Sequence, residues 1–259
     1  MKNDEIDYKL YGDDMQFVEI ELDPQETVIA EAGSLMMMDD QIRMETIFGD
    51  TSSAGGFLDK LKGAGKRLIT GESLFITTFT NDGHGKKHVS FASPYPGKII
   101  PMDLQQLNGK LICQKDAFLA AANGVSIGVE FQRKLGTGFF GGEGFIMQKL
   151  EGDDLAFIHA GGTVVKKDLQ PGERLKIDTG CLVAMTSDID YSIEAVKGVK
   201  TALFGREGLF FATLEGPGSV WVQSMPFNRL ASRVFSAAPS TGGSSEEKGI
   251  GGLSDLFNK

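Results

Sequence analysis

Three stretches of the chain repeat one ten-residue pattern: ESLFITTFTN at 72–81, EGFIMQKLEG at 143–152 and EGLFFATLEG at 207–216. Each begins with Glu, continues with Ser or Gly and three apolar residues, and has Phe or Leu at its eighth position. Apolar residues therefore fall on both faces of an alternating pattern, which is typical of a strand covered on both sides. We predict three equivalent strands inside a two-layer β structure.

The repeat extends upstream of these strands. The stretches EAGSLMMM at 31–38, QKDAFLAA at 114–121 and DTGCLVAM at 178–185 align without gaps. Before them, LDPQETVIAE at 22–31 matches LQPGERLKID at 169–178, while the middle copy, at 104–114, has one extra residue. Pro followed by Gly or a polar residue favours a turn between strands. Because the order of motifs is the same in each copy, we predict an all-β chain of three diverged modules.

Each copy also carries an insertion just before its Glu-led strand, at 55–71, 128–142 and 193–206, with Gly-rich or weakly helical patterns. The insertions concentrate basic and Phe side chains in a chain of net charge −9. These residues are Phe57, Lys60, Lys62, Lys66, Arg67, Arg133, Lys134, Phe139, Phe140, Lys197, Lys200, Phe204 and Arg206.

If the modules are related by a pseudo-threefold axis, the insertions lie at one end of the molecule. Basic residues beside Phe suit an anionic membrane surface or a protein partner with an acidic groove. The alternative is that the Phe side chains fold under the modules and the basic residues are ordinary solvated charges. These alternatives stay open at this point.

The three repeat-related carboxylates, Glu72, Glu143 and Glu207, have two interpretations. Related carboxylates that meet on an axis can bind a cation. Alternatively, each one caps a backbone turn or pairs with a base of the neighbouring insertion. We favour the second interpretation, because three unpaired charges would repel each other.

Length and composition limit the function classes. The 259 residues suit one large domain, and we expect a single globular unit over 1–235, with repeats at about 8–95, 96–160 and 161–230. Residues 236–259 are rich in Ser and Gly and predict a flexible C-terminal tail, or a peptide that docks through Leu253, Leu256 and Phe257. The net charge of −9 argues against a nucleic-acid partner.

The sequence has no recognisable targeting signal and only two cysteines, and both observations favour a cytoplasmic protein. Peripheral association with a membrane is the other option that we keep. No apolar run is long enough to span a membrane, and the acidic N-terminus does not resemble a secretory signal. The two cysteines, Cys113 and Cys181, lie in apolar runs and are predicted to be buried thiols.

Several of these motifs carry a family resemblance. The stretches EAGSLMMMD, PYPGKIIPMDL and GREGLFFATLEGPGSVWVQSMP, together with the whole segment 138–173, resemble a bacterial family of uncharacterised activity. That family is similar to the yeast mitochondrial biogenesis protein named for altered inheritance of mitochondria. The resemblance covers roughly residues 8–230 and implies three units with a fold like that of the tryptophan RNA-binding attenuation protein, a short double-stranded β-helix. It implies no established enzyme activity and supplies no catalytic residues.

The sequence offers little for catalysis. A cupin-type metal enzyme needs several His and a carboxylate in one barrel, whereas this chain has only His84, His88 and His159. We place His84 and His88 in a Gly/Lys-rich turn and expect no metal, no cofactor and no enzyme activity. We predict a non-enzymatic scaffold or regulatory interaction protein that can form oligomers. A small-molecule or sugar-binding β module is the alternative, and a metal-dependent enzyme is the weakest one.

Overall fold

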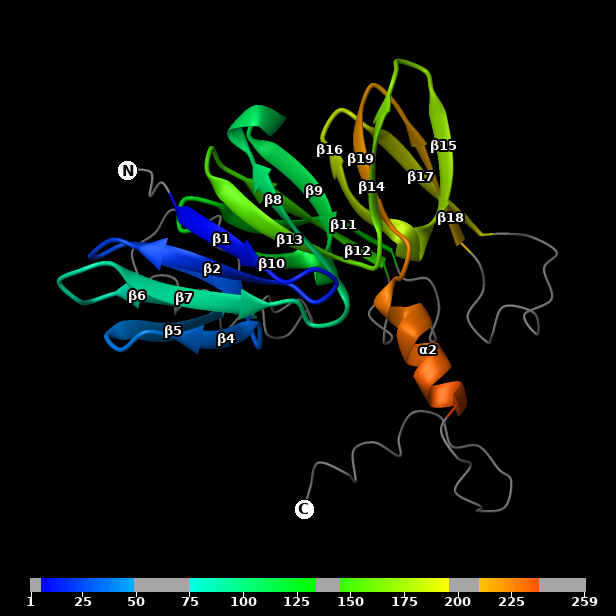
Figure 1. The fold of residues 1–259 in the computed structure, drawn as a ribbon. Helices are drawn as coiled ribbons and strands as arrows, with labels where there is room; N and C mark the ends of the chain where they lie inside the picture. Colours follow the sequence, from blue (N-terminus) through cyan, green and yellow to red (C-terminus); the bar gives the residue numbers. More distant parts are fainter. Residues whose placement is uncertain (1–5, 49–74, 134–144, 196–209, 238–259) are drawn as a thin grey trace.

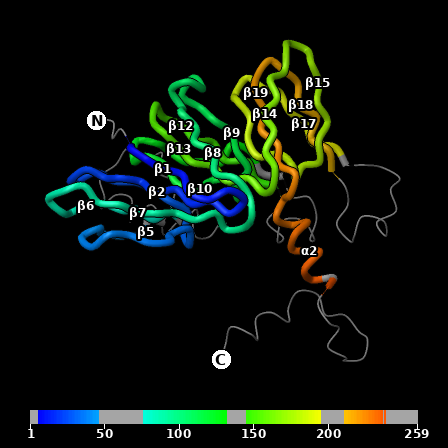
Figure 2. The backbone as a smooth tube through the Cα atoms, viewed as in Figure 1, coloured from blue at the N-terminus to red at the C-terminus, as the bar shows by residue number. Residues whose placement is uncertain are grey.

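The computed structural model describes residues 6–48, 75–133, 145–195 and 210–237 of the chain (Figure 1). Nearly all of the regular structure in these ranges is β, which confirms the predicted all-β class. The strands follow the three copies in order, and Figure 2 shows the chain passing from one module to the next across the molecule.

The first module contains β1 (Asp7–Tyr11), β2 (Phe17–Leu22), β3 (Thr27–Glu31), β4 (Leu35–Met38), β5 (Ile42–Phe48), β6 (Phe75–Asn81) and β7 (Lys87–Ala92). The second contains β8 (Gly97–Asp103), β9 (Lys110–Gln114), β10 (Phe118–Ala122), β11 (Ser126–Arg133), β12 (Phe145–Glu151) and β13 (Leu155–Gly161). The third contains β14 (Val164–Leu169), β15 (Arg174–Asp178), β16 (Leu182–Thr186), β17 (Asp190–Ala195), β18 (Phe210–Glu215) and β19 (Gly218–Gln223). Short 3₁₀ turns lie at Gln105–Leu107, Lys115–Ala117 and Thr179–Cys181.

The repeated ten-residue pattern forms the strands β6, β12 and β18. Each is the middle strand of an equivalent trio, β5-β6-β3, β11-β12-β9 and β17-β18-β15. Burial on both faces is clearest in β12, where Phe145 and Met147 on one face and Leu150 on the other are all inaccessible to solvent. The predicted strands are therefore confirmed. Both faces are buried in β6 and β12, whereas β18 buries Ala212 and Leu214 and leaves Phe211 half-buried.

The modules share sheets with one another. The second module contributes β10, which pairs antiparallel with β3 of the first, and the third contributes β16, which pairs antiparallel with β9 of the second. Each junction joins two trios into one six-stranded sheet, with orders β5-β6-β3-β10-β13-β8 and β11-β12-β9-β16-β19-β14. One core cluster, with Val28 and Ala120 among its members, therefore runs from the first module into the second.

A four-stranded sheet, β1-β2-β7-β4, and the trio β15-β18-β17 stand at the two ends of this series (Figure 1). The same trio of paired strands thus occurs three times along the chain. A pseudo-threefold axis that relates the modules stays a prediction, as do the proposed repeat boundaries.

The Pro-containing motifs form matching turns, as the sequence predicts. The backbone N–H of Glu26 donates to the carbonyl of Asp23 at 3.0 Å, and Gln25 between them has φ 71°. The third module has the same turn with Gly172 at φ 79°. In both turns the Glu side chain accepts a hydrogen bond from the backbone N–H three residues earlier, at 2.7 Å for Glu26 and 2.9 Å for Glu173. The Glu of the motif therefore stabilises its own turn.

A buried side chain holds the turn that connects β6 to β7, two strands of different sheets. Asn81 is fully buried, and its Nδ2 donates to the carbonyls of Leu22 and Gly85, each at 2.8 Å. Its Oδ1 accepts from the backbone N–H of Gly83 at 2.9 Å. The side chain thus satisfies three backbone groups that the turn leaves unpaired.

The helix α2 (Phe227–Ala237) was not among the sequence predictions. Its apolar spacing at Phe227, Leu230 and Val234 is a helical signal, but it is short and adjoins the Ser/Gly-rich tail. The helix is attached at its first turn, where the ring of Phe227 lies 5.2 Å from that of Tyr95 and Arg229 forms a 2.8 Å ion pair with Asp178. Figure 1 shows its remaining turns extending away from the sheets.

Candidate functional site

The residues predicted to form a contact surface fall almost entirely outside the described ranges. Only Arg133 lies within them, at the end of β11, where it pairs with Phe145 of β12. The residues outside the described ranges are Phe57, Lys60, Lys62, Lys66, Arg67, Lys134, Phe139, Phe140, Lys197, Lys200, Phe204 and Arg206, together with Glu72, Glu143 and Glu207. The hypothesis on the tail residues Leu253, Leu256 and Phe257 also lies outside them.

The structure does show where each insertion leaves and re-enters its module. In every module the described strands end and resume at residues that face each other across one antiparallel pair: Phe48 with Phe75, Arg133 with Phe145, and Ala195 with Phe210. The three insertions are therefore attached at structurally equivalent points. The two predicted from Gly128 and Ile193 begin later than expected, because β11 runs to Arg133 and β17 to Ala195.

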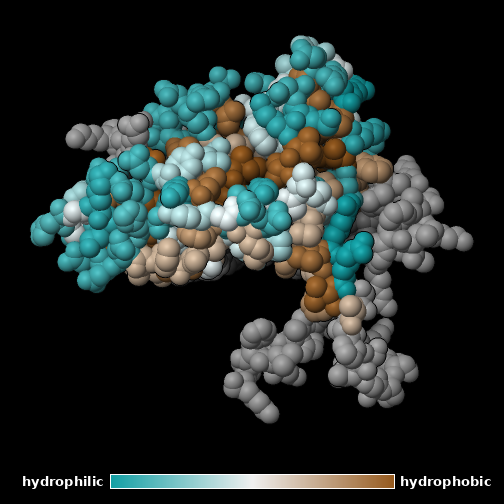
Figure 3. Space-filling view, in the orientation of Figure 1, coloured by the Kyte–Doolittle hydropathy of each residue, from teal (hydrophilic) through white to brown (hydrophobic). Residues whose placement is uncertain are grey.

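Exposed apolar side chains gather at β4 and β5. Met36, Met37 and Met38 of β4 are 51%, 46% and 42% exposed, and Met44 of β5 is 49% exposed. Figure 3 shows apolar colour along the lower margin of the molecule, over these strands, and again on α2. The helix contributes Val234 and Phe235, which are both more than half exposed. Exposed apolar surface of this kind marks contact sites for partners.

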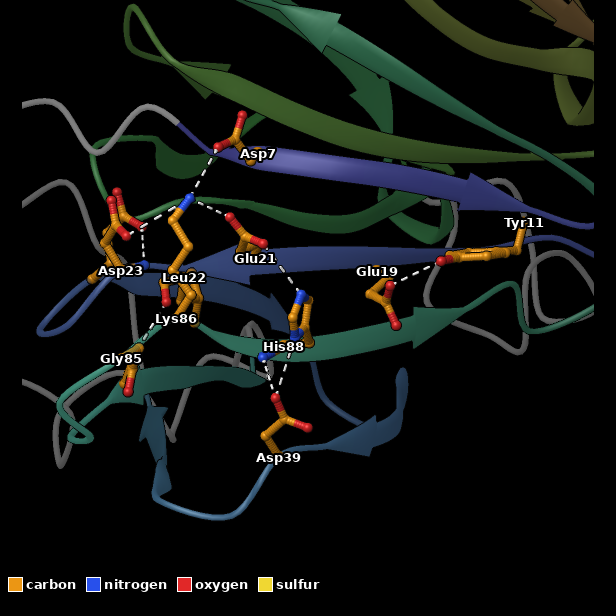
Figure 4. A network of polar contacts seen from close by, with 12 residues as sticks. Asp7, Tyr11, Glu19, Glu21, Leu22, Asp23, Asp39, Gly85, Lys86 and His88 are labelled. Atoms are coloured by element: carbon orange, nitrogen blue, oxygen red, sulfur yellow. Dashed lines mark hydrogen bonds and ion pairs between the residues drawn. The ribbon is translucent and has the colours of Figure 1, made fainter.

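A network of charged side chains covers the sheet next to β4 (Figure 4). Lys86 contacts Glu21 and lies 3.8 Å from Asp7. His88 lies between Glu21 at 3.3 Å and Asp39 at 3.2 Å. The hydrogen bond from Lys86 lowers the pKa of Glu21, and the backbone N–H of His88 lowers the pKa of Asp39. Because these ion pairs lie at the surface, each is expected to contribute about 1 kcal/mol or less to stability.

The location of His88 corrects one sequence prediction. His88 lies in β7 rather than in the preceding turn, because the polar run LysLysHis continues directly into the strand at Lys87. His159 lies in β13, on a different sheet. Among the residues that the structure describes, no three His, Cys, Asp or Glu side chains are grouped so that they could hold a metal ion.

A second polar cluster lies at the junction of the modules, where His159 is buried and Tyr95 and Glu31 are half-buried. The Nε2 of His159 lies 3.1 Å from the carbonyl oxygen of Tyr95, and the two rings are in edge contact with their centroids 4.4 Å apart. Since a carbonyl only accepts, Nε2 carries the proton and Nδ1 is left as a buried acceptor without a partner among the described residues. Sequence reasoning missed this cluster, because its members come from different modules.

Burial changes the pKa values of the groups in this cluster. Burial, with a smaller contribution from the charge of Asp116, raises the pKa of Glu31 to about 7. Burial lowers the pKa of His159 to about 4, against the opposing effect of its hydrogen bond to Tyr95. Burial, followed by the charges of Asp116 and Glu31, raises the pKa of the Tyr95 phenol. With these pKa values, His159 and Tyr95 are uncharged at neutral pH, whereas Glu31 is about half ionised.

At the position equivalent to His159, the third module has a side chain whose polar atoms are both hydrogen-bonded. In the strand pairing, Gln223 occupies the position of His159; its Oε1 accepts from the backbone N–H of Gly161 at 2.7 Å, and its Nε2 donates to the carbonyl of Gly180 at 2.9 Å. The position of Glu31 is taken by Gln114 in the second module and Asp178 in the third. The position of Glu31 is therefore occupied by a polar residue in all three modules.

The cysteines are poor candidates for chemistry. Cys113 is fully buried, as predicted, and burial raises the pKa of its thiol to about 12. Cys181 is only partly buried, and burial again raises its pKa. A reactive cysteine needs the opposite shift, toward the thiolate. Within the described ranges, no helix is long and apolar enough to cross a membrane.

Comparison with known proteins agrees with the fold. The family model described as mitochondrial biogenesis AIM24 matches residues 8–225. The uncharacterized protein M6_Spy0233 of Streptococcus pyogenes serotype M6 is 30% identical over 232 residues, which cover 88% of this chain and 89% of that protein. The crystal structure of protein SPYM3_0169 from Streptococcus pyogenes is similar with a TM-score of 0.70 and 24% identity, covering 90% of this chain and 100% of that one.

Proposed function

The chain belongs to the AIM24 mitochondrial biogenesis family, and from this premise and its exposed surfaces we propose that it is a non-enzymatic scaffold or regulatory interaction protein. The observation that carries the proposal is the exposure of Met36, Met37 and Met38 on an outer strand. Methionine is adaptable and is well represented at binding surfaces. An outer strand also offers unpaired backbone groups to a partner.

The buried chemistry supports the non-enzymatic part of the proposal. Catalytic groups must reach a substrate, and nucleophiles need an adjacent base. Here His159 is 2% exposed, and the raised pKa of Cys113 keeps that thiol protonated. These groups are better suited to packing than to catalysis.

The three insertions add a second proposed contact element. They are attached at equivalent points and carry basic and Phe side chains in an acidic chain. This composition favours an anionic membrane surface as the second candidate partner, since each basic residue near such a surface adds about 1 kcal/mol of attraction.

Photo-crosslinking in cells tests the interaction function directly. A photoreactive residue at Met37 is compared with the same residue at Met15, which is 60% exposed and precedes β2. We expect protein adducts at position 37 and few at position 15. Equal yields at the two positions, or none at either, would overturn the proposal.

Vesicle co-sedimentation tests the membrane candidate separately. Anionic and neutral vesicles are compared at low and high salt, with the wild type and with a variant in which Phe57, Phe139, Phe140 and Phe204 are changed to Ser. Salt-sensitive binding to anionic vesicles that the variant loses, while it stays folded, supports membrane docking. Absence of binding by the wild type removes this candidate.

A further inference from the structure

The helix α2 is divided into an apolar side and a polar side. At roughly 100° per residue, its apolar positions fall within an arc of about 160°. These apolar positions are Phe227, Leu230, Ala231, Val234, Phe235 and Ala237. The positions on the other side include Asn228, Arg229, Ser232 and Arg233. Figure 3 shows apolar colour along one side of α2 and polar colour beside it, so the helix is amphipathic rather than uniformly apolar.

The sheets contact α2 at its first turn. This turn is attached through the ring contact of Phe227 and the ion pair of Arg229, and Figure 1 shows the following turns extending away from the sheets. Val234 and Phe235, near the far end, are 62% and 63% exposed, more than any other large apolar side chain that the structure describes. A surface helix ordinarily buries its apolar side against the core. Here that side is uncovered at its far end.

The polar side of α2 is basic in a chain that is acidic overall. The helix carries Arg229 and Arg233 and no Asp or Glu, whereas the whole chain has a net charge of −9. The side chain of Arg229 stays half exposed beside Asp178, and Arg233 is exposed one turn further along. Basic groups beside exposed apolar groups match a surface that is anionic outside and apolar beneath. Anionic phospholipid headgroups and their acyl chains form such a surface.

The other exposed apolar surface, on β4, does not have this charge. Asp39 and Asp40 follow directly after Met38, and both Glu21 and Asp39 contact His88 (Figure 4). Carboxylates at that position are repelled by anionic lipid. Of the two exposed apolar surfaces, charge therefore favours α2 for contact with a membrane and β4 for contact with a protein.

We propose that the last two turns of α2 dock on an anionic phospholipid surface. Leu230, Val234 and Phe235 enter the boundary between headgroups and acyl chains, and Arg233 lies among the phosphates. The inference rests on the membrane candidate of the proposed function and names a contact element that does not depend on the insertions. Because the attraction is partly electrostatic, salt weakens the binding.

A polarity-sensitive fluorophore tests this contact at one position of the full chain. It is attached to Val234→Cys in a Cys181→Ser background, and Cys113 stays in place because it is fully buried. Vesicles of phosphatidylcholine alone are compared with vesicles that also contain phosphatidylglycerol. We expect the emission to shift to the blue with anionic vesicles at low salt, and to change little with neutral vesicles. The same fluorophore at His84→Cys, in the exposed turn between β6 and β7 on the other side of the molecule (Figure 1), should not respond.

Substitutions on the two sides of the helix measure their separate contributions by vesicle co-sedimentation. Changing Val234 and Phe235 together to Ser should weaken binding to anionic vesicles by at least about tenfold, because the burial of both side chains is lost. Arg233→Gln should weaken it by about fivefold at low salt, and by less at high salt, because one basic residue near the surface is removed.

The matched control for the apolar substitutions is Val165→Ser, at a valine of β14 that is 44% exposed. It should bind vesicles like the wild type. Because Val234, Phe235 and Arg233 are also exposed, we expect every variant to keep the urea midpoint of the wild type. A loss of vesicle binding is then a loss of contact rather than of folding.

The outcomes separate this inference from the proposed function. If the wild type binds anionic vesicles while the fluorophore at position 234 does not respond, or while the Val234 and Phe235 double variant binds equally well, α2 is not the contact. The inference is then overturned and the membrane candidate survives through the insertions. If the wild type binds no vesicles, both are overturned, and photo-crosslinking at Met37 alone decides the scaffold function. A photoreactive residue at position 235 that captures a protein in cells, without any response to vesicles, would assign α2 to a protein partner instead.

Discussion

Glu31 and His159 are each expected to make the free energy of unfolding depend on pH, and the two dependences have opposite signs. The pKa of Glu31 rises from 4.5 to about 7 on folding, so the folded state binds more protons and stability falls as the pH rises from 4.5 to 7. The pKa of His159 falls from 6.5 to about 4, so the unfolded state binds more protons and stability rises between pH 4 and 6.5.

Each difference corresponds to about 3 kcal/mol, since one pKa unit is worth about 1.4 kcal/mol. Between pH 4.5 and 6.5 the two contributions nearly cancel in the wild type, and each single variant removes one of them. Glu31→Gln, which places the residue of Gln114 at the equivalent position, should become more stable with rising pH up to about 6.5. It should exceed the wild type at pH 8 by up to about 3 kcal/mol. His159→Gln should lose stability over the range from 4.5 to 7.

Urea denaturation from pH 4 to pH 8, followed by circular dichroism, measures these profiles. Glu194→Gln, at an exposed carboxylate of β17, is the control for a general change in charge. If Glu31→Gln follows the same pH profile as the wild type, the carboxyl is not held protonated by burial and the reasoning is wrong. If only His159→Gln changes the profile, the error is confined to Glu31.

Four further substitutions test the turns and the buried hydrogen bonds by the same denaturation measurement. Gln25→Gly should stabilise the protein by about 1 kcal/mol, because Gly adopts positive φ without strain, and the reciprocal Gly172→Gln should cost about the same; effects of the opposite sign contradict this account. Asn81→Ala should cost about 3 kcal/mol, because it leaves several buried backbone groups unpaired. Gln223→Ala should cost about 2 kcal/mol, because it removes two hydrogen bonds at the module junction, and a loss below about 0.5 kcal/mol would show that water replaces them.

The sequence was most informative about local structure. The turns at Pro24 and Pro171 were predictable because Pro and a following Gly or polar residue constrain the backbone within four residues. The strands β6, β12 and β18 were predictable because their alternating pattern repeats three times. The helix α2 was missed because a single short apolar stripe beside a Ser/Gly-rich tail is a weak signal.

The candidate site was less predictable. The insertion residues singled out from composition stay a prediction, although their points of attachment are equivalent. The cluster around Tyr95 and His159 combines residues that are 64 positions apart, and no spacing rule brings such residues together. The methionines of β4 are visible in the sequence, but their aligned equivalents are ordinary core residues.

By itself, the sequence determined that the chain is built from three β modules, which residues form their central strands, and where the insertions occur. These features depend on backbone preferences and on the alternation of apolar residues, which act over a few positions. Only the tertiary structure decided that the second and third modules each complete the sheet of the module before them. That pairing depends on contacts between distant segments, so only the structure shows that β4 and β15 remain exposed where their equivalents are buried.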